Sequence, residues 1–200
     1  MKFLVFLISI IFIGNLNAKE LENSDYKLFK SFIDNLGVVN LDFEQTKKIP
    51  NIKKEFKNSG KLKFIKNKGL IWKEEAPNNL SFIATKKCYL IKEGNEIKNN
   101  DNLNNLPHFD DIKNLIDKIL NNDLSELKET FNVDYNELIN NSWNLTLTPK
   151  ILRIKKYIKT LKVLGTTNEI LNIEVHYVNK TIIYFNFSKA KVFLDDEIKC

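Results

Sequence analysis

An alternation of apolar and polar residues recurs along this chain and restricts its fold more than any other feature. Near the end, one apolar series consists of Leu171, Ile173, Val175 and Tyr177, and the next of Ile183, Phe185 and Phe187. Successive side chains of a β-strand point to opposite faces of a sheet, so a period of two predicts a strand with one buried face. The polar pair Asn179-Lys180 lies between the two series. Two such strands joined by a short polar turn predict a β-hairpin.

Shorter series with the same period lie on both sides of the centre of the chain. Their apolar members are Val39, Leu41 and Phe43; Leu62 and Phe64; Leu70 and Trp72; Leu80, Phe82 and Ala84; Tyr89 and Ile91; Trp143, Leu145 and Leu147; and Leu161 and Val163. Short strands at regular spacing, separated by polar turns, are typical of an antiparallel meander. We therefore expect about four or five strands, then a helical insertion, then about four more strands.

Three segments have the spacing of amphipathic helices instead. The first lies between Ser24, which is suited to an N-cap, and Gly37, which is suited to a C-terminal stop. The second follows Pro107 and carries the apolar stripe Ile112, Leu115, Ile116, Ile119 and Leu120. The third opens at Asp123 and places Leu124, Leu127 and Phe131 on one side. This order predicts an α+β fold in which helices cover one long, curved antiparallel sheet.

The N-terminus predicts export from the cytoplasm. Met1-Lys2 is followed by an uncharged apolar run over 3–13 and by small or polar residues up to Ala18, which is the pattern of a secretory signal peptide. The run is too short for a membrane-spanning helix, and no cysteine near the cleavage site predicts a lipid anchor. We expect a signal peptide over 1–18, cleaved near Ala18, and a single domain over 19–200.

The charge and the cysteines allow narrower statements. The formal net charge is +6, but Arg153 is the only arginine, and lysine lacks the planar fork that suits phosphates and base edges. Nucleic acid is therefore not an expected partner. Cys88 and Cys200 are the two cysteines. Export to an oxidising compartment permits a disulfide between them, and two free thiols are the equal alternative.

Catalytic patterns are weak. His108 lies in a polar loop and His176 on the polar phase of a strand, with no set of metal ligands at a workable spacing. Ser24 and Ser125 each precede a lysine by three residues, as in serine–lysine acylating enzymes, but the companion motifs are missing and lysines are abundant. The sequence predicts no enzyme, no metal and no cofactor, with a serine hydrolase as the remote alternative.

The segment 150–162 is rich in basic residues interleaved with apolar ones. It predicts either a solvated strand or turn, or a contact with an anionic membrane surface or an acidic partner.

Several short motifs resemble the periplasmic lipoprotein carrier family, LolA. They are Phe43-Glu44-Gln45, Ser59-Gly60 before a strand, Gly69-Leu70-Ile71-Trp72 followed by Ala76-Pro77, Asn122-Asp123-Leu124 with Leu127 and Phe131, and Trp143 to Pro149. Their order matches the family over most of the chain, as in a divergent branch. The resemblance implies an incomplete antiparallel β-barrel covered by the N-terminal helix and a central helical lid.

The resemblance also implies a function. Periodicity alone cannot distinguish a cavity for acyl chains from a plain hydrophobic core. Family members bind lipoprotein acyl chains released by an inner-membrane ABC-type complex and pass them to an outer-membrane acceptor. On this reading the chain is a monomeric periplasmic carrier of lipid or lipoprotein acyl chains, and the alternative is an envelope sensor or adaptor that binds a protein partner. The residues expected to line the lipid cavity are Leu62, Phe64, Leu70, Trp72, Phe82, Leu115, Ile119, Trp143, Leu145, Leu147, Ile173, Val175, Phe185 and Phe187. Lys66 stands where family members carry a lid-holding arginine, so it is a possible latch that lacks the guanidinium fork.

Overall fold

Two antiparallel meanders meet in the middle of one sheet. The computed structural model describes residues 27–35, 37–66, 68–76, 79–85, 89–94, 96–98 and 125–190. The first meander consists of β1 (Val38–Lys48), β2 (Phe56–Ile65), β3 (Gly69–Ala76), β4 (Leu80–Thr85), β5 (Tyr89–Glu93) and β6 (Glu96–Lys98). The second consists of β7 (Phe131–Glu137), β8 (Ser142–Pro149), β9 (Ile158–Thr166), β10 (Ile170–Tyr177) and β11 (Ile182–Lys189). The strand order is β6-β5-β4-β3-β2-β1-β11-β10-β9-β8-β7.

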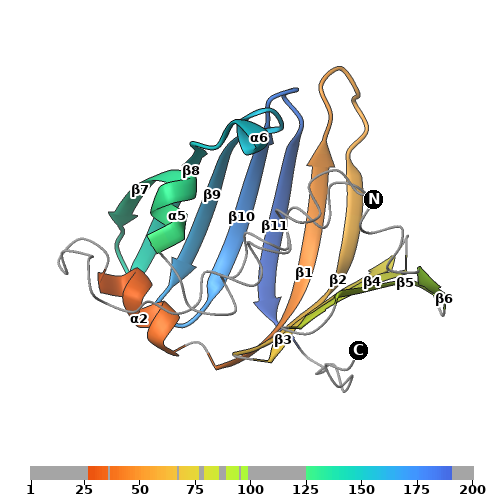
Figure 1. The fold of residues 1–200 in the computed structure, drawn as a ribbon, viewed down its shortest axis with the longest axis horizontal. Coiled ribbons are helices and arrows are strands. Elements are labelled where there is room, and N and C mark those ends of the chain that lie inside the picture. The colour runs from red at the N-terminus through yellow and green to blue at the C-terminus, as the bar shows by residue number, and fades with distance from the viewer. Residues whose placement is uncertain are drawn as a thin grey trace.

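The first strand of the sheet pairs with the last. The antiparallel register of β1 and β11 runs from Leu41 opposite Lys189 to Lys48 opposite Ile182. This pairing joins the two meanders into an 11-stranded sheet whose edges are β6 and β7. Figure 1 shows that the sheet bends strongly, with β3 to β6 turned away from β7 to β11 and the two edges far apart. The expected curved, unclosed antiparallel sheet is confirmed.

Three short helices accompany the described strands. They are α2 (Lys27–Asn35), α5 (Ser125–Thr130) and α6 (Leu152–Lys155). The helix α2 confirms the predicted N-terminal helix, and it lies against β8 and β9. The helix expected after Pro107 falls outside the described residues, as does the segment 1–18. Among the described residues, no helix is long and apolar enough to cross a bilayer.

One element boundary was predicted wrongly. Phe131 was expected to end a helical stripe, but it begins β7, where it lies opposite Pro149 and is 1% exposed. Strand pairing buries this ring and satisfies its backbone, which outweighs the helical spacing of Leu127 and Phe131. Two strands, β6 and β7, were not predicted.

A second difference concerns the phase of β10. Leu171 was expected on the buried face, yet it is half-buried while Ile170 is buried. The register with β9 shifts between Ile170 and Asn172, so a bulge moves the apolar phase by one residue there. From Ile173 onward the predicted alternation holds.

Candidate functional site: the apolar face of the sheet

The predicted cavity residues share one face of the sheet. Those in the described residues come from β2, β3, β4, β8, β10 and β11, and each is buried with an exposed fraction of 8% or less. They are Leu62, Phe64, Leu70, Trp72, Phe82, Trp143, Leu145, Leu147, Ile173, Val175, Phe185 and Phe187. Leu115 and Ile119, the two expected contributions from the lid, lie outside the described residues. The structure thus brings together side chains that are up to 125 positions apart in the sequence (Leu62 and Phe187).

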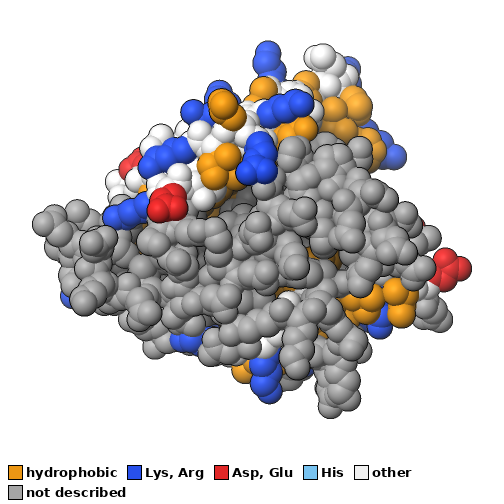
Figure 2. Space-filling view, viewed as in Figure 1, with side chains coloured by type: hydrophobic (Ala, Val, Ile, Leu, Met, Phe, Trp, Pro, Cys, Tyr) orange, Lys and Arg blue, Asp and Glu red, His pale blue; other side chains and the backbone are white. Residues whose placement is uncertain are grey.

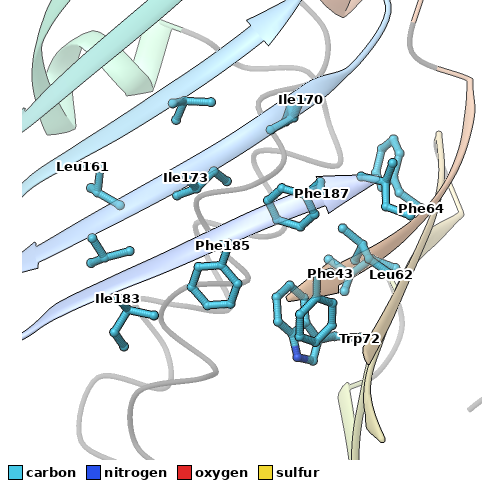
Figure 3. Close-up of a cluster of buried hydrophobic side chains, with 14 of the residues drawn as sticks. Phe43, Leu62, Phe64, Trp72, Leu161, Ile170, Ile173, Ile183, Phe185 and Phe187 are labelled. Atoms are coloured by element: carbon cyan, nitrogen blue, oxygen red, sulfur yellow. The ribbon is translucent and has the colours of Figure 1, made fainter. Parts of the chain in front are cut away.

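Four aromatic rings form the centre of this face. Phe43 stacks on Trp72 with 4.1 Å between ring centroids, and Phe185 meets Trp72 edge-on at 5.6 Å. Phe187 extends the row, parallel to Phe185 at 6.3 Å. Figure 3 shows these rings crossing from β3 over β1 to β11, with the aliphatic chains of Ile173 and Ile183 beyond them. Such pairs contribute about 0.5–1.5 kcal/mol beyond area burial, so the centre is a firm aromatic platform.

A glycine makes the position of Phe43 possible. Gly60 lies opposite Phe43 in the register of β1 and β2. A Cβ atom on Gly60 would come within 2.7 Å of the Phe43 ring and 2.0 Å of the Lys73 carbonyl oxygen. The ring therefore lies directly on the backbone of β2, and only glycine leaves room for it.

A second aromatic cluster lies where α2 covers the face. Phe29 meets Trp143 edge-on at 4.9 Å, and Phe32 lies 5.6 Å from the same ring. The Trp143 ring itself rests on Gly165, its register partner in β9. Its Nε1–H donates to the Thr166 carbonyl oxygen at 2.9 Å, so this buried indole is fully satisfied. The helix α2 thus packs on the sheet through ring contacts with one well-fixed tryptophan.

Tyr135 adds a polar clamp at the same place. Its hydroxyl accepts a hydrogen bond from the Phe29 backbone N–H at 3.3 Å and donates to the Glu137 carboxylate at 3.1 Å. The Leu28 backbone N–H donates to the same carboxylate oxygen at 3.2 Å. Partial burial, and secondarily the Glu137 charge, raise the pKa of Tyr135 to about 12. Side chains of β7 therefore satisfy two backbone N–H groups in the first turn of α2.

Trp72 differs from Trp143 in one respect. The ring is 0% exposed, but its Nε1–H has no hydrogen-bond acceptor among the described residues. A buried donor without an acceptor costs about 1–3 kcal/mol. In Figure 3 the nitrogen lies at the end of the indole that points away from Phe187. The aromatic platform thus contains one polar group able to bind an acceptor oxygen.

Sequence reasoning left several members of this face out of the cavity. They are Phe29 and Phe32 on α2, Leu41 and Phe43 on β1, Phe131 on β7, Leu161 and Val163 on β9, and Ile183 on β11. The alternation had already placed most of them in strands. What was missing was the pairing of β1 with β11, which puts Phe43 at the centre of the platform.

The remaining candidate residues have no common location. Lys66 is half-buried in the turn after β2, where its backbone N–H donates to the Gly37 carbonyl oxygen at 2.8 Å, so the latch stays a prediction. His176 lies on the opposite face from Val175, 2.9 Å from the Glu174 carboxylate. Cys88, Cys200, His108 and Ser24 lie outside the described residues. In the part of the chain that the structure describes, no three His, Cys, Asp or Glu side chains are grouped closely enough to bind a metal ion.

Comparison with known proteins gives likenesses of fold. No protein-family model and no curated protein matches the sequence. Among solved structures, the chain is similar to a LolA superfamily protein from Nitrosomonas europaea at 8% identity, covering 84% of this chain and 96% of that one with a TM-score of 0.38. It is also similar to a proposed outer membrane lipoprotein-sorting protein domain from Vibrio parahaemolyticus, at 8% identity, 84% and 92% coverage and a TM-score of 0.41. A third likeness, to the MucA/MucB complex of Pseudomonas aeruginosa, has 8% identity, 80% and 55% coverage and a TM-score of 0.44.

Proposed function

We propose that this chain is a non-enzymatic carrier that binds the acyl chains of a lipid or lipoprotein against the apolar face of its sheet. The observation that carries the proposal is the continuity of that face, which runs unbroken across both meanders and is lined at its centre by Phe43, Trp72 and Phe185. Transfer of each acyl methylene from water to such a surface contributes about 0.8 kcal/mol. Uptake and release need no covalent step, since burial of the chains supplies the binding energy.

The unsatisfied indole of Trp72 supports an acylated ligand over a plain hydrocarbon. Fatty acyl chains are joined to their carriers through ester or amide carbonyls, which are good acceptors. A carbonyl oxygen reaching the Trp72 Nε1–H would complete the hydrogen bonding of that group while the chain lies on the rings of Phe43 and Phe185. The polar group would then fix the depth at which the acyl chain enters.

Exposure of this face to a ligand requires part of its cover to move. Part of that cover is α2, which is held by Phe29, Phe32 and the clamp from Tyr135. Because these contacts are local to β7 to β9, α2 can swing off that end of the face without disturbing the pairing of β1 with β11. A latch at Lys66 would act close to the end of α2, because the Lys66 backbone N–H donates to the carbonyl oxygen of Gly37, between α2 and β1.

The expected signal peptide and the LolA-like motifs support a periplasmic location for this activity. There, an acylated protein or lipid cannot cross water unless its chains are shielded. The resemblance supplies the proposed partners: an inner-membrane ABC-type complex that releases the cargo and an outer-membrane acceptor that takes it. The carrier would work as a monomer with no cofactor.

Quenching by brominated acyl chains tests the proposal directly. A Trp143→Phe variant keeps Trp72 as the single tryptophan, and a Trp72→Phe variant keeps Trp143. We expect a brominated fatty acyl ester to quench Trp72 fluorescence more strongly than Trp143 fluorescence, because Phe29 and Phe32 shield Trp143. Native mass spectrometry of protein purified from a bacterial periplasm should show a bound lipid. Lipid-free protein together with unquenched Trp72 would refute the carrier function.

The second candidate is an envelope sensor or adaptor that binds a protein. The close mutual packing of the central rings favours it, since a face filled by its own side chains leaves no need for a ligand. Ile119→Asp, on the predicted central helix, separates the two functions. It should abolish acyl uptake by a carrier and leave the partner binding of an adaptor intact.

A further inference from the structure

Three segments far apart in the sequence form one rim of the sheet. Lys48 at the end of β1 pairs with Ile182 at the start of β11, and Tyr177 at the end of β10 pairs with Ile158 at the start of β9. The Val178 backbone N–H also donates to the Tyr157 carbonyl oxygen at 2.9 Å. The loop between β1 and β2, the segment containing α6, and the turn between β10 and β11 therefore lie at the same end of the strands, at the top of Figure 1. We call the segments 47–57, 150–157 and 178–181 the basic rim.

The basic rim concentrates the positive charge of the protein. It contains ten Lys or Arg residues and one acidic residue, Glu55, which pairs with Lys48 at 3.0 Å. The formal net charge of the whole chain is only +6, so the rest of the chain is acidic on balance. This separation of charge gives the molecule a strongly positive end.

The same rim exposes apolar side chains. Leu152 is 81% exposed, Val178 54% and Ile52 47%. Phe56, Ile151 and Tyr157 are also exposed on these segments. Figure 2 shows hydrophobic and Lys or Arg side chains next to one another over this end of the molecule. The rim is thus both cationic and apolar at its surface, with contributions from three separate segments.

We propose that the basic rim docks the protein on an anionic lipid bilayer. Protruding aliphatic and aromatic side chains among lysines are what interfacial binding requires, since the apolar groups enter the acyl boundary while the cations bind lipid phosphates. An acidic protein fits the rim less well, because lysine is depleted in protein interfaces and this rim has a single arginine, Arg153. Docking needs no ligand on the apolar face of the sheet, so it stands apart from the carrier function.

Two variants and their matched controls test the docking. The charge variant is Lys53→Glu, Lys155→Glu and Lys156→Glu, and its control changes Lys68, Lys162 and Lys189 to Glu. The apolar variant is Ile52→Ser, Leu152→Ser and Val178→Ser, and its control changes Val38, Ile97 and Ile139 to Ser. All twelve residues are exposed, and the six control residues lie outside the basic rim, so circular dichroism should show an unchanged fold in each protein.

The assay is flotation with vesicles of phosphatidylcholine alone or of an equimolar mixture with phosphatidylglycerol. We expect the wild type to bind the anionic vesicles and not the neutral ones, with binding weakened by salt. Each reversed charge should weaken binding by at least about fivefold, so the charge variant should bind over about a hundredfold more weakly, while its control keeps the wild-type affinity within about fivefold. The apolar variant should lose at least about tenfold and its control should not.

Two results would overturn the proposal. The first is equal loss of binding in a variant and its control. Vesicle binding would then depend on net charge or overall surface hydrophobicity and not on the basic rim. The second is a wild type that binds neither vesicle type but binds a polyglutamate peptide through the rim. The partner would then be an acidic protein. Neither result bears on the quenching of Trp72, so docking and acyl binding can fail separately.

Discussion

The substitution Gly165→Ala probes how closely the sheet is packed at one point of the apolar face. A Cβ atom at this position would lie 2.4 Å from Cζ2 and 2.8 Å from Cη2 of Trp143, and 2.9 Å from the Glu169 carbonyl oxygen. Ordinary carbon contacts begin near 3.4–3.5 Å, so the indole has to move by about 1 Å. Because Trp143 is 0% exposed and wedged beneath Phe29, this displacement disturbs the seat of α2 as well.

The magnitude follows from two contributions. Forcing an extra methyl group into a closely packed site costs about 1–3 kcal/mol. Moving the indole by about 1 Å also breaks its 2.9 Å hydrogen bond to Thr166, which adds about 1 kcal/mol. Alanine also lowers the conformational entropy of the unfolded chain, which offsets about 0.5 kcal/mol of the lost stability. The free energy of unfolding should therefore fall by about 1.5–3.5 kcal/mol.

Urea denaturation followed by circular dichroism measures this loss, and Gly37→Ala is the matched control. A Cβ atom on Gly37 meets nothing within 4 Å, so that variant should stay within about 0.5 kcal/mol of the wild type. In a double-mutant cycle, Trp143→Phe should relieve part of the cost of Gly165→Ala, because the smaller ring lacks the clashing atoms. Equal stabilities of the Gly165→Ala and Gly37→Ala variants would refute the packing argument.

Three further predictions concern the rings and the clamp. Trp72→Phe removes the unsatisfied donor and keeps an aromatic ring. In titration calorimetry, affinity for an acyl ester should fall by about tenfold while affinity for an alkane of equal length stays within about twofold. Equal losses for both ligands would contradict a role for the indole N–H. Phe185→Ala empties the centre of the platform and should cost about 3–5 kcal/mol in urea denaturation, whereas Phe56→Ala on an exposed site should cost under about 0.5 kcal/mol; similar losses would mean that the platform is not packed as described. The folded-state pKa of Tyr135 is raised to about 12, so its contribution to stability is complete below pH 10 and is lost as the pH rises from about 10 to 12. In pH-dependent denaturation the wild type should therefore lose stability more steeply than Tyr135→Phe over that range. Identical slopes would count against the clamp.

All of the described strands except β6 and β7 could be predicted from the sequence. In β8 the alternation of Trp143, Leu145 and Leu147 with polar residues gave the correct buried face, because strand geometry imposes a period of two wherever one face is apolar. The hairpin at Asn179-Lys180 was equally readable, and Lys180 has the positive φ of 66° that such a tight turn needs. At Phe131 the prediction was wrong because a helical period and a strand period compete there. At Leu171 it was wrong because a bulge shifts the strand phase by one residue.

Local sequence pattern determined nine of the eleven described strands of this protein and, apart from the start of β10, which side of each of those nine is apolar. It also determined the positive charge of 150–157 and the glycines at 60 and 165. Tertiary structure alone decided that β1 pairs with β11, since that contact joins residues more than a hundred positions apart and depends on no local spacing. That pairing places Phe43 over Trp72 beside Phe185, and it brings 47–57 next to 178–181 in the basic rim. Both proposed surfaces arise from it, because a sheet gathers side chains by strand order and register, which the period of two leaves open.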